Sequence, residues 1–146
     1  MDEEKRILNL YISTLKAISL IATHCHWTVK QKTFFGDHLM FERIYKSSLE
    51  NLDEAAEKVI GVFGLDNFDY DLQTSFLTKI LNKYSPMKTD PISMLIAIVS
   101  DFIKLSVSLY DFLDKNKKLT LGFDDMLCAI SNTSEGFLYL LKQTAE

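Results

Sequence analysis

Five side chains in the first half of the sequence have the chemistry of metal ligands: His26, His38, Glu42, Asp53 and Glu57. Imidazole nitrogen and carboxylate oxygen together suit Fe(II), which accepts nitrogen donors and also needs hard oxygen donors. The sequence has only two cysteines, so we do not expect the thiolate cluster of a zinc or iron–sulfur site. The residue types therefore predict a redox-active iron site, with manganese or zinc as alternative occupants.

The spacing of these residues predicts where the site forms. His38 and Glu42 are four residues apart, as are Asp53 and Glu57, so on a helix each pair converges on one ion. The two pairs lie only about 60° apart around the helix but about 22 Å apart along it. One ion cannot span that distance. If both pairs serve one site, two copies of the helix must run antiparallel, and the site exists only between subunits.

The residues around the ligands resemble the signature of the Dps proteins (DNA protection during starvation), also called mini-ferritins. The resemblance rests on the spacing of the five ligand types, on Trp27 and on the apolar residues between them. A weaker match reaches the end of the chain, so the resemblance covers most of it. The matching segments are His26-Trp27-Thr28-Val29-Lys30, Phe34, Phe41-Glu42, Ile44-Tyr45, Asp53-Glu54-Ala55-Ala56-Glu57-Lys58, Asp125-Met126-Leu127 and Glu135-Gly136-Phe137-Leu138-Tyr139.

The resemblance implies a hollow dodecamer that oxidises Fe(II), preferentially with hydrogen peroxide, and stores the Fe(III) mineral inside. It implies iron sites at two-fold contacts between subunits, with Trp27 beside the iron as an electron donor. Plain interface packing is the alternative for Trp27. By the same analogy Asp125 and Glu135 line a pore for iron, although helix capping for Asp125 and solvation for Glu135 are the preferred explanations.

Departures from the family pattern concern DNA more than iron. Gln31, Lys58, Gly136 and Tyr139 stand where Gly, Arg, Lys and Trp are usual, and none of these positions is a ligand. The Lys/Arg-rich terminus with which many family members grip DNA has no counterpart here. The 16 basic residues are outnumbered by 20 acidic ones, giving a net charge of −4. Since duplex affinity comes mostly from Lys and Arg neutralising phosphates, we expect DNA binding to be weak or absent.

Composition predicts one globular domain over residues 1–146, with 47% hydrophobic and 25% charged residues. Cys25 and Cys128 each lie in an apolar stretch, so we expect two buried thiols and no disulfide. We find no signal peptide before the first helix and expect no apolar run long enough to span a bilayer. These features predict a cytoplasmic protein without membrane contact.

Apolar periodicity predicts four long helices. The first spans residues 3–30 and carries a second apolar stripe that includes Ile7, Leu10, Ala17 and Ile21. Together the two stripes make an apolar surface wider than a bundle core requires, which predicts a contact between subunits. Thr33 is the expected N-cap of the second helix, which stops near Gly64. Asp90-Pro91 and Thr120 predict the starts of the third and fourth.

Connection lengths predict the topology. Short links join the first two helices and the last two, whereas residues 64–90 form a long connection with a short helix near residues 76–81. This is an all-α, ferritin-like four-helix bundle with one long crossover. A di-iron site inside one bundle is not expected, because it needs Glu-x-x-His and the three histidines have Ile21, Thr23 and Phe35 at that offset.

We therefore predict a homo-oligomeric ferroxidase and iron-storage protein whose substrates are Fe(II) and hydrogen peroxide, and which protects against oxidative damage. The alternative is a ferritin-like shell without enzymatic activity, or a DNA-compacting protein. His24 lies out of register with the ligands and is expected to be structural, with an auxiliary metal contact as the minor alternative.

Overall fold

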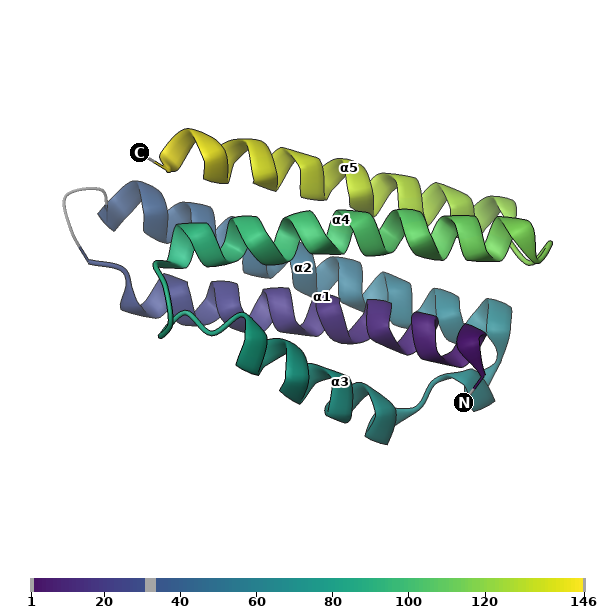
Figure 1. The fold of residues 1–146 in the computed structure, drawn as a ribbon. Coiled ribbons are helices and arrows are strands. Elements are labelled where there is room, and N and C mark those ends of the chain that lie inside the picture. The colour runs from purple at the N-terminus through teal and green to yellow at the C-terminus, as the bar shows by residue number, and fades with distance from the viewer. Residues whose placement is uncertain (1, 31–33, 146) are drawn as a thin grey trace.

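The computed structural model describes residues 2–30 and 34–145. Four long helices, α1 (Glu3–Thr28), α2 (Phe34–Phe63), α4 (Pro91–Lys115) and α5 (Leu121–Thr144), form an antiparallel bundle (Figure 1). The helices α1 and α2 make one hairpin, and α4 and α5 make the other. The predicted all-α class and bundle architecture are confirmed.

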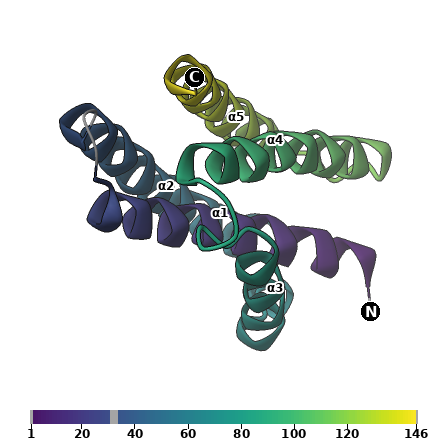
Figure 2. The ribbon, with the colours of Figure 1, turned by 60° about the vertical axis from the view of Figure 1, so that its left-hand side comes forward.

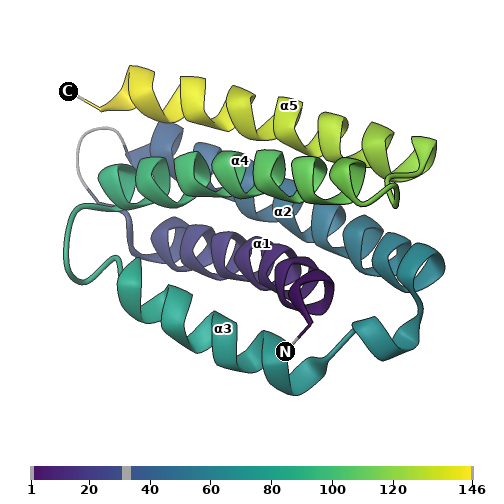
Figure 3. The same ribbon diagram turned by 45° about the vertical axis from the view of Figure 1, so that its right-hand side comes forward.

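The connection between the hairpins runs the length of the bundle (Figure 3). It holds a short 3-10 helix, η1 (Leu65–Asn67), and the helix α3 (Tyr70–Lys83), which lies outside α1. Gly64 opens this connection with φ +89°, a conformation that glycine adopts without strain. The crossover helix is predicted correctly in kind, although it begins earlier than the pattern indicated.

Capping side chains fix the helix starts. Asp90 accepts a hydrogen bond from the Ser93 amide at 2.9 Å, and Thr120 accepts one from the Phe123 amide at 3.1 Å. Both caps were predicted, and each satisfies an amide that the first turn of a helix leaves without a partner. The predicted cap Thr33 lies outside the described residues.

The core of the bundle fills the space between the two hairpins. Its largest fully buried side chains come from all four long helices and include Tyr11, Phe41, Phe102 and Phe123. Figure 2 shows α4 and α5 on one side of α1 and α2, with α3 on the other side. Contacts between α2 and α5 occur near both ends, where the Thr144 hydroxyl lies 3.7 Å from the Met40 sulfur and the rings of Phe63 and Phe123 are 5.2 Å apart. The bundle thus positions α2 with one face on the core and its other face open.

The second apolar stripe of α1 is covered within the chain, which corrects our expectation of a subunit contact there. Ile7, Ala17 and Ile21 are each at most 5% exposed, whereas Leu10 is half-buried. The helix α3 packs along α1, with Ile80 beside Leu10 and Leu81 beside Ile21. The pattern showed that the stripe needs a cover but could not show that the crossover supplies it.

A buried polar network fixes α3 on α1. The Asn9 side chain, 1% exposed, donates to the carbonyls of Lys5 (2.6 Å) and Asn67 (2.8 Å). It accepts from the Asp69 amide at 3.0 Å and from the Gln73 side chain at 2.9 Å. One side chain therefore satisfies polar groups of α1, η1 and α3 that would otherwise be buried without partners.

Two helices of the described part of the chain, α1 and α4, are long and apolar enough to cross a membrane by length and composition alone. The expectation that no apolar run is that long was therefore wrong. About 72% of the most apolar window of α1 is buried in the bundle, against 39% of that of α4. Core helices of soluble proteins pass the same test, so this is weak evidence for a span.

The two cysteines differ in their surroundings. Cys25 is completely buried, as predicted, whereas Cys128 is exposed, and both are free thiols. The prediction for Cys128 was wrong because the core face of α5 passes through Leu127 and Ile130 and leaves position 128 outside it. The prediction of no disulfide is in agreement with the structure.

Candidate metal centre

His26 and His38 meet where α1 ends and α2 begins. Their imidazole rings stack with centroids 3.7 Å apart and an interplanar angle of 21°. The Nδ1 of His26 lies 2.9 Å from the carbonyl oxygen of His38, and the Nδ1 of His38 lies 2.9 Å from the carbonyl oxygen of His26. The two histidines thus bind each other reciprocally through ring nitrogen and main chain.

These contacts determine which ring nitrogen is available. A carbonyl oxygen only accepts hydrogen bonds, so Nδ1 of each neutral ring must carry the proton and donate. The Nε2 of each ring then keeps its lone pair, as in metal-binding histidines whose other nitrogen donates to a carbonyl. The geometry therefore fits the predicted role of His26 and His38 as ligands.

Two further aromatic rings flank the histidines and were not assigned a role from the sequence. Phe34 stacks on His38 with centroids 5.1 Å apart and a 24° interplanar angle. The edge of Tyr45 meets His26 at 5.3 Å and 65°. A signal for Tyr45 was available, because it lies seven residues, or about two turns, after His38 on the same helix face.

Glu42 lies one turn after His38 and is held by a lysine. The Lys46 Nζ is 2.7 Å from the Glu42 carboxylate. The hydrogen bond and charge of Lys46 lower the pKa of Glu42, and the imidazoles of His26 and His38 lower it further by a smaller amount. Glu42 is therefore an ionised carboxylate one turn from His38 that is paired with Lys46, and its role as a metal ligand stays a prediction.

Asp53 and Glu57 are far from this cluster. Both are exposed on the second half of α2, which is one continuous helix from Phe34 to Phe63. Helical rise puts Asp53 about 22 Å beyond His38. The structure thus brings His26 and His38 together, with Glu42 one turn further along α2, and leaves Asp53 and Glu57 as a separate carboxylate pair.

Within residues 2–30 and 34–145, no three His, Cys, Asp or Glu side chains of one chain lie in position to hold a single ion. One chain therefore carries two separate half-sets of ligands. The first is His26, His38 and Glu42, which includes the nitrogen donors, and the second is Asp53 and Glu57, which have oxygen donors only.

The remaining predicted residues lie elsewhere. Trp27 is 73% exposed beside His26. Asp125 and Glu135 are both exposed on α5, whose N-terminus is capped by Thr120 instead of Asp125. His24 lines a groove with Leu81 and Met87, on the crossover side of α1. The roles predicted for these residues stay predictions.

No protein-family model matches the sequence. Known structures are nevertheless similar over nearly the whole chain. Dps from Listeria monocytogenes superposes with a TM-score of 0.80 at 19% identity, covering 99% of this chain and 94% of that one. Dps from Mycobacterium smegmatis, in a tetragonal form, gives 0.77 at 20% identity, covering 97% and 86%. Dps from Microbacterium arborescens in its high iron form gives 0.75 at 18%, covering 100% and 98%.

These similarities define the class of fold. The chain has the ferritin-like fold of the Dps proteins, with a short helix in the crossover. The resemblance inferred from the sequence is confirmed in its structural neighbours and in its fold. At such low identity the likeness concerns the fold, and function has to be argued from the residues.

Proposed function

We propose that this protein is a ferroxidase and iron-storage protein that oxidises Fe(II) at sites shared between two subunits. The observation that supports this most directly is the His26–His38 pair, in which both Nδ1 atoms bind carbonyls and each Nε2 therefore keeps a lone pair. Glu42 lies beside them as an ionised oxygen donor. Asp53 and Glu57 supply the second set of oxygen donors at the other end of the same helix.

The chemistry of the donor set favours oxidation. Carboxylates stabilise Fe(III) more than Fe(II), because the more highly charged ion gains more from hard anionic oxygen, and they thereby lower the reduction potential. With hydrogen peroxide as the oxidant, two Fe(II) ions give one electron each, the O–O bond breaks, and both oxygens end as water or hydroxide. Hydrolysis of the Fe(III) then yields ferric oxyhydroxide, which removes both reactants of hydroxyl-radical formation.

A second copy of the chain is needed to unite the half-sets. An antiparallel two-fold contact between two α2 helices would place Asp53 and Glu57 of each chain against His26, His38 and Glu42 of the other. The same operation makes two equal sites, since a two-fold contact is self-complementary. We propose a closed dodecamer built on such contacts, soluble and cytoplasmic.

An anaerobic titration tests the function. Fe(II) is added to the metal-free protein without oxygen, binding is followed by calorimetry, and hydrogen peroxide is then added while the Fe(III) absorbance is recorded. We expect saturable Fe(II) binding and rapid oxidation with two Fe(II) consumed per peroxide. Oxidation no faster than in buffer would contradict the proposal, and the same titration with Mn(II) and Zn(II) tests the alternative occupants.

Paired variants test the sharing of the site. His26→Ala with His38→Ala, and separately Asp53→Ala with Glu57→Ala, should each abolish fast oxidation. The matched control is Glu50→Ala with Glu54→Ala, an exposed i,i+4 acid pair on the same helix, which should leave the rate unchanged. Mixing the two inactive variants after reversible disassembly should restore part of the rate. Verified mixed shells without any recovery would falsify the shared site.

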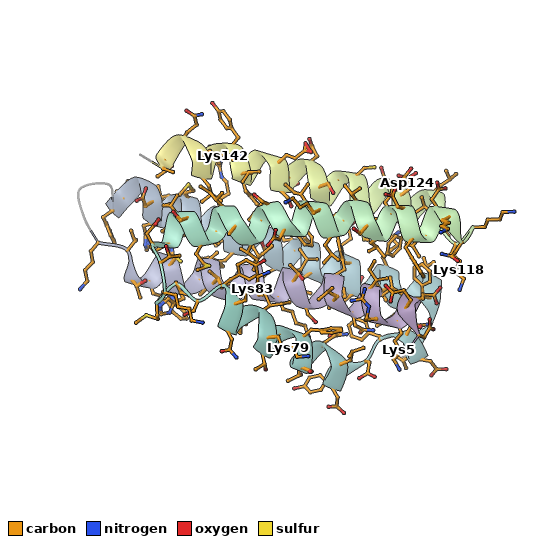
Figure 4. All side chains as sticks on the ribbon, in the orientation of Figure 1. Lys5, Lys79, Lys83, Lys118, Asp124 and Lys142 are labelled. Carbon is orange, nitrogen blue, oxygen red and sulfur yellow. The ribbon has the colours of Figure 1, made fainter. Side chains whose placement is uncertain are left out.

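The alternative function is a shell without enzymatic activity or a DNA-compacting protein. The labelled lysines in Figure 4 are dispersed, with Lys5 on α1, Lys79 and Lys83 on α3, Lys118 before α5 and Lys142 on α5. Two of them are already neutralised, since Lys5 pairs with Asp69 at 3.3 Å and Lys118 with Glu4 at 2.6 Å. Retention of duplex DNA in a gel-shift assay at about 0.15 M salt would favour DNA compaction.

A further inference from the structure

Four aromatic rings follow one another at the α1–α2 turn. Phe34 stacks on His38, His38 stacks on His26, and Tyr45 contacts His26 in a T-shaped arrangement. The two reciprocal imidazole–carbonyl hydrogen bonds lie inside this row. We call these four rings with their two hydrogen bonds the histidine clasp.

We propose that the histidine clasp forms without metal, and that Phe34 and Tyr45 are positioning residues that preset His26 and His38 for an incoming ion. This inference rests on the proposed function for the identity of the ion as Fe(II). The clasp itself is a property of the metal-free chain, so it can be tested separately.

The main-chain partners show why the clasp belongs to the hairpin. His26 is in the last turn of α1, where carbonyls have no helical amide to bind. Its carbonyl oxygen accepts a hydrogen bond from Nδ1 of His38. The His38 carbonyl oxygen lies in the second turn of α2 and accepts a hydrogen bond from Nδ1 of His26. Each histidine therefore bonds the helix that carries the other one, and the hydrogen bonds need no metal.

The flanking rings restrict the motion of this pair. A carbonyl acceptor leaves an imidazole free to tilt about the hydrogen bond, whereas a ring packed against each imidazole limits that tilt. Phe34 packs on His38 and Tyr45 packs on His26. Phe34 carries no donor atom, and Tyr45→Phe removes the one hydroxyl that Tyr45 could offer to the ion. Their expected effect is therefore on ligand orientation, where errors well below 1 Å already weaken a site.

Side-chain nitrogen spectra of metal-free protein test the clasp. With only three histidines, 15N-histidine labelling and magic-angle-spinning NMR resolve each ring, assigned through His24→Gln. At about pH 8, His26 and His38 should show protonated Nδ1 and unprotonated Nε2, because both Nδ1 atoms lie 2.9 Å from carbonyl oxygens. The opposite tautomer at either residue in the unsubstituted protein would overturn the proposal, whatever the variants do.

Four variants separate ring packing from other effects. Phe34→Leu and Tyr45→Leu should convert the single tautomer into a mixture and weaken anaerobic Fe(II) binding, although no ligand is changed. Tyr45→Phe keeps the ring edge and should retain both properties. Tyr110→Leu, at a half-buried tyrosine on α4, is the control for general destabilisation and should also retain both.

The outcomes distinguish the clasp from the proposed function. Unchanged tautomers and unchanged Fe(II) binding in both leucine variants would show that Phe34 and Tyr45 position nothing. A protein that shows the expected tautomers but neither binds nor oxidises Fe(II) would support the histidine clasp and contradict the proposed ferroxidase function. If Tyr45→Leu does not fold, Phe34→Leu decides, because Phe34 is 44% exposed and its replacement removes little buried surface.

Discussion

At the scale of single residues, the chemistry of this chain depends on what each side chain already binds. The role of Glu42 as an oxygen donor stays a prediction, and the sequence alone did not show that Lys46 holds its carboxylate. The His26–His38 contacts could not be predicted either, because they require two helix ends to meet. The exposure of Cys128, in contrast, could have been predicted. The apolar periodicity of α5 is visible in the sequence, and it places position 128 outside the buried face of the helix.

Cys128 allows a direct test of these surroundings. The hydrogen bond to the Asp124 carboxylate, with burial and charge, raises the pKa of the Cys128 thiol. Because the thiolate is the reactive form, Asp124→Asn should lower that pKa and speed alkylation by iodoacetamide at pH 8. Asp125→Asn removes a weaker, purely electrostatic effect and should speed it less. Equal rates in all three proteins would contradict this explanation.

Cys25 serves as the internal reference in the same experiment. Burial raises the pKa of its thiol to about 11, so it stays protonated at pH 8 and out of reach of the reagent. Mass spectrometry should find one modified cysteine per native chain and two in denaturant.

At the scale of elements, capping and periodicity identified the four long helices, and connection length identified the crossover. The prediction that another subunit covers the second apolar stripe of α1 was wrong. Periodicity shows that a stripe is apolar but not what buries it, and α3 gave little warning because Gln73 is its one buried residue. Leu77, Ile80 and Leu81 of α3 pack on the core but are only partly buried, and the other contacts with α1 are polar.

The Asn9 network should therefore be important for stability. Asn9→Leu removes both the donor and the acceptor and leaves the Asp69 amide, the Gln73 side chain and the Asn67 carbonyl without this partner. The buried Gln73 side chain left without a partner should cost about 1–3 kcal/mol, and each of the two partly buried hydrogen bonds about 0.5–1.5 kcal/mol, so the free energy of unfolding should fall by about 2–6 kcal/mol. Urea unfolding at fixed protein concentration measures this.

Asn132→Leu is the matched control, since Asn132 is exposed on α5. It should change the free energy of unfolding by no more than about 0.5 kcal/mol. Equal effects of the two substitutions would mean that the Asn9 hydrogen bonds add nothing beyond the general cost of an Asn-to-Leu change.

At the scale of the whole molecule, the proposed assembly now rests on different evidence from that offered by the sequence alone. The stripe on α1 is covered and no longer supports it. The separation of the two half-sets along α2 does, together with large apolar side chains exposed near the histidine clasp, namely Trp27 at 73%, Phe35 at 72% and Leu39 at 45%. Exposed apolar clusters of this kind are typical of protein contacts.

Light scattering measures the assembly directly. Twelve chains of 16.8 kDa have a total mass of 201.6 kDa, and we expect that value at micromolar concentration. Trp27→Glu introduces a charge at the proposed contact and should shift the mass toward smaller species, whereas Tyr139→Glu, at an exposed aromatic residue on α5, should not. A monomer of 16.8 kDa at micromolar concentration would rule out both the shell and the shared site.

The position of both half-sets on one uninterrupted helix has a consequence for inheritance. In a cell that makes normal and defective chains, a chain lacking only Asp53 and Glu57 spoils the one site to which it would donate them, and its own histidines still serve with a normal neighbour. Activity then falls in proportion to the defective fraction. A chain lacking both half-sets spoils two sites, so the surviving activity follows the square of the normal fraction. With equal amounts of both chains, about half of the activity would therefore remain with the first kind of allele and about a quarter with the second.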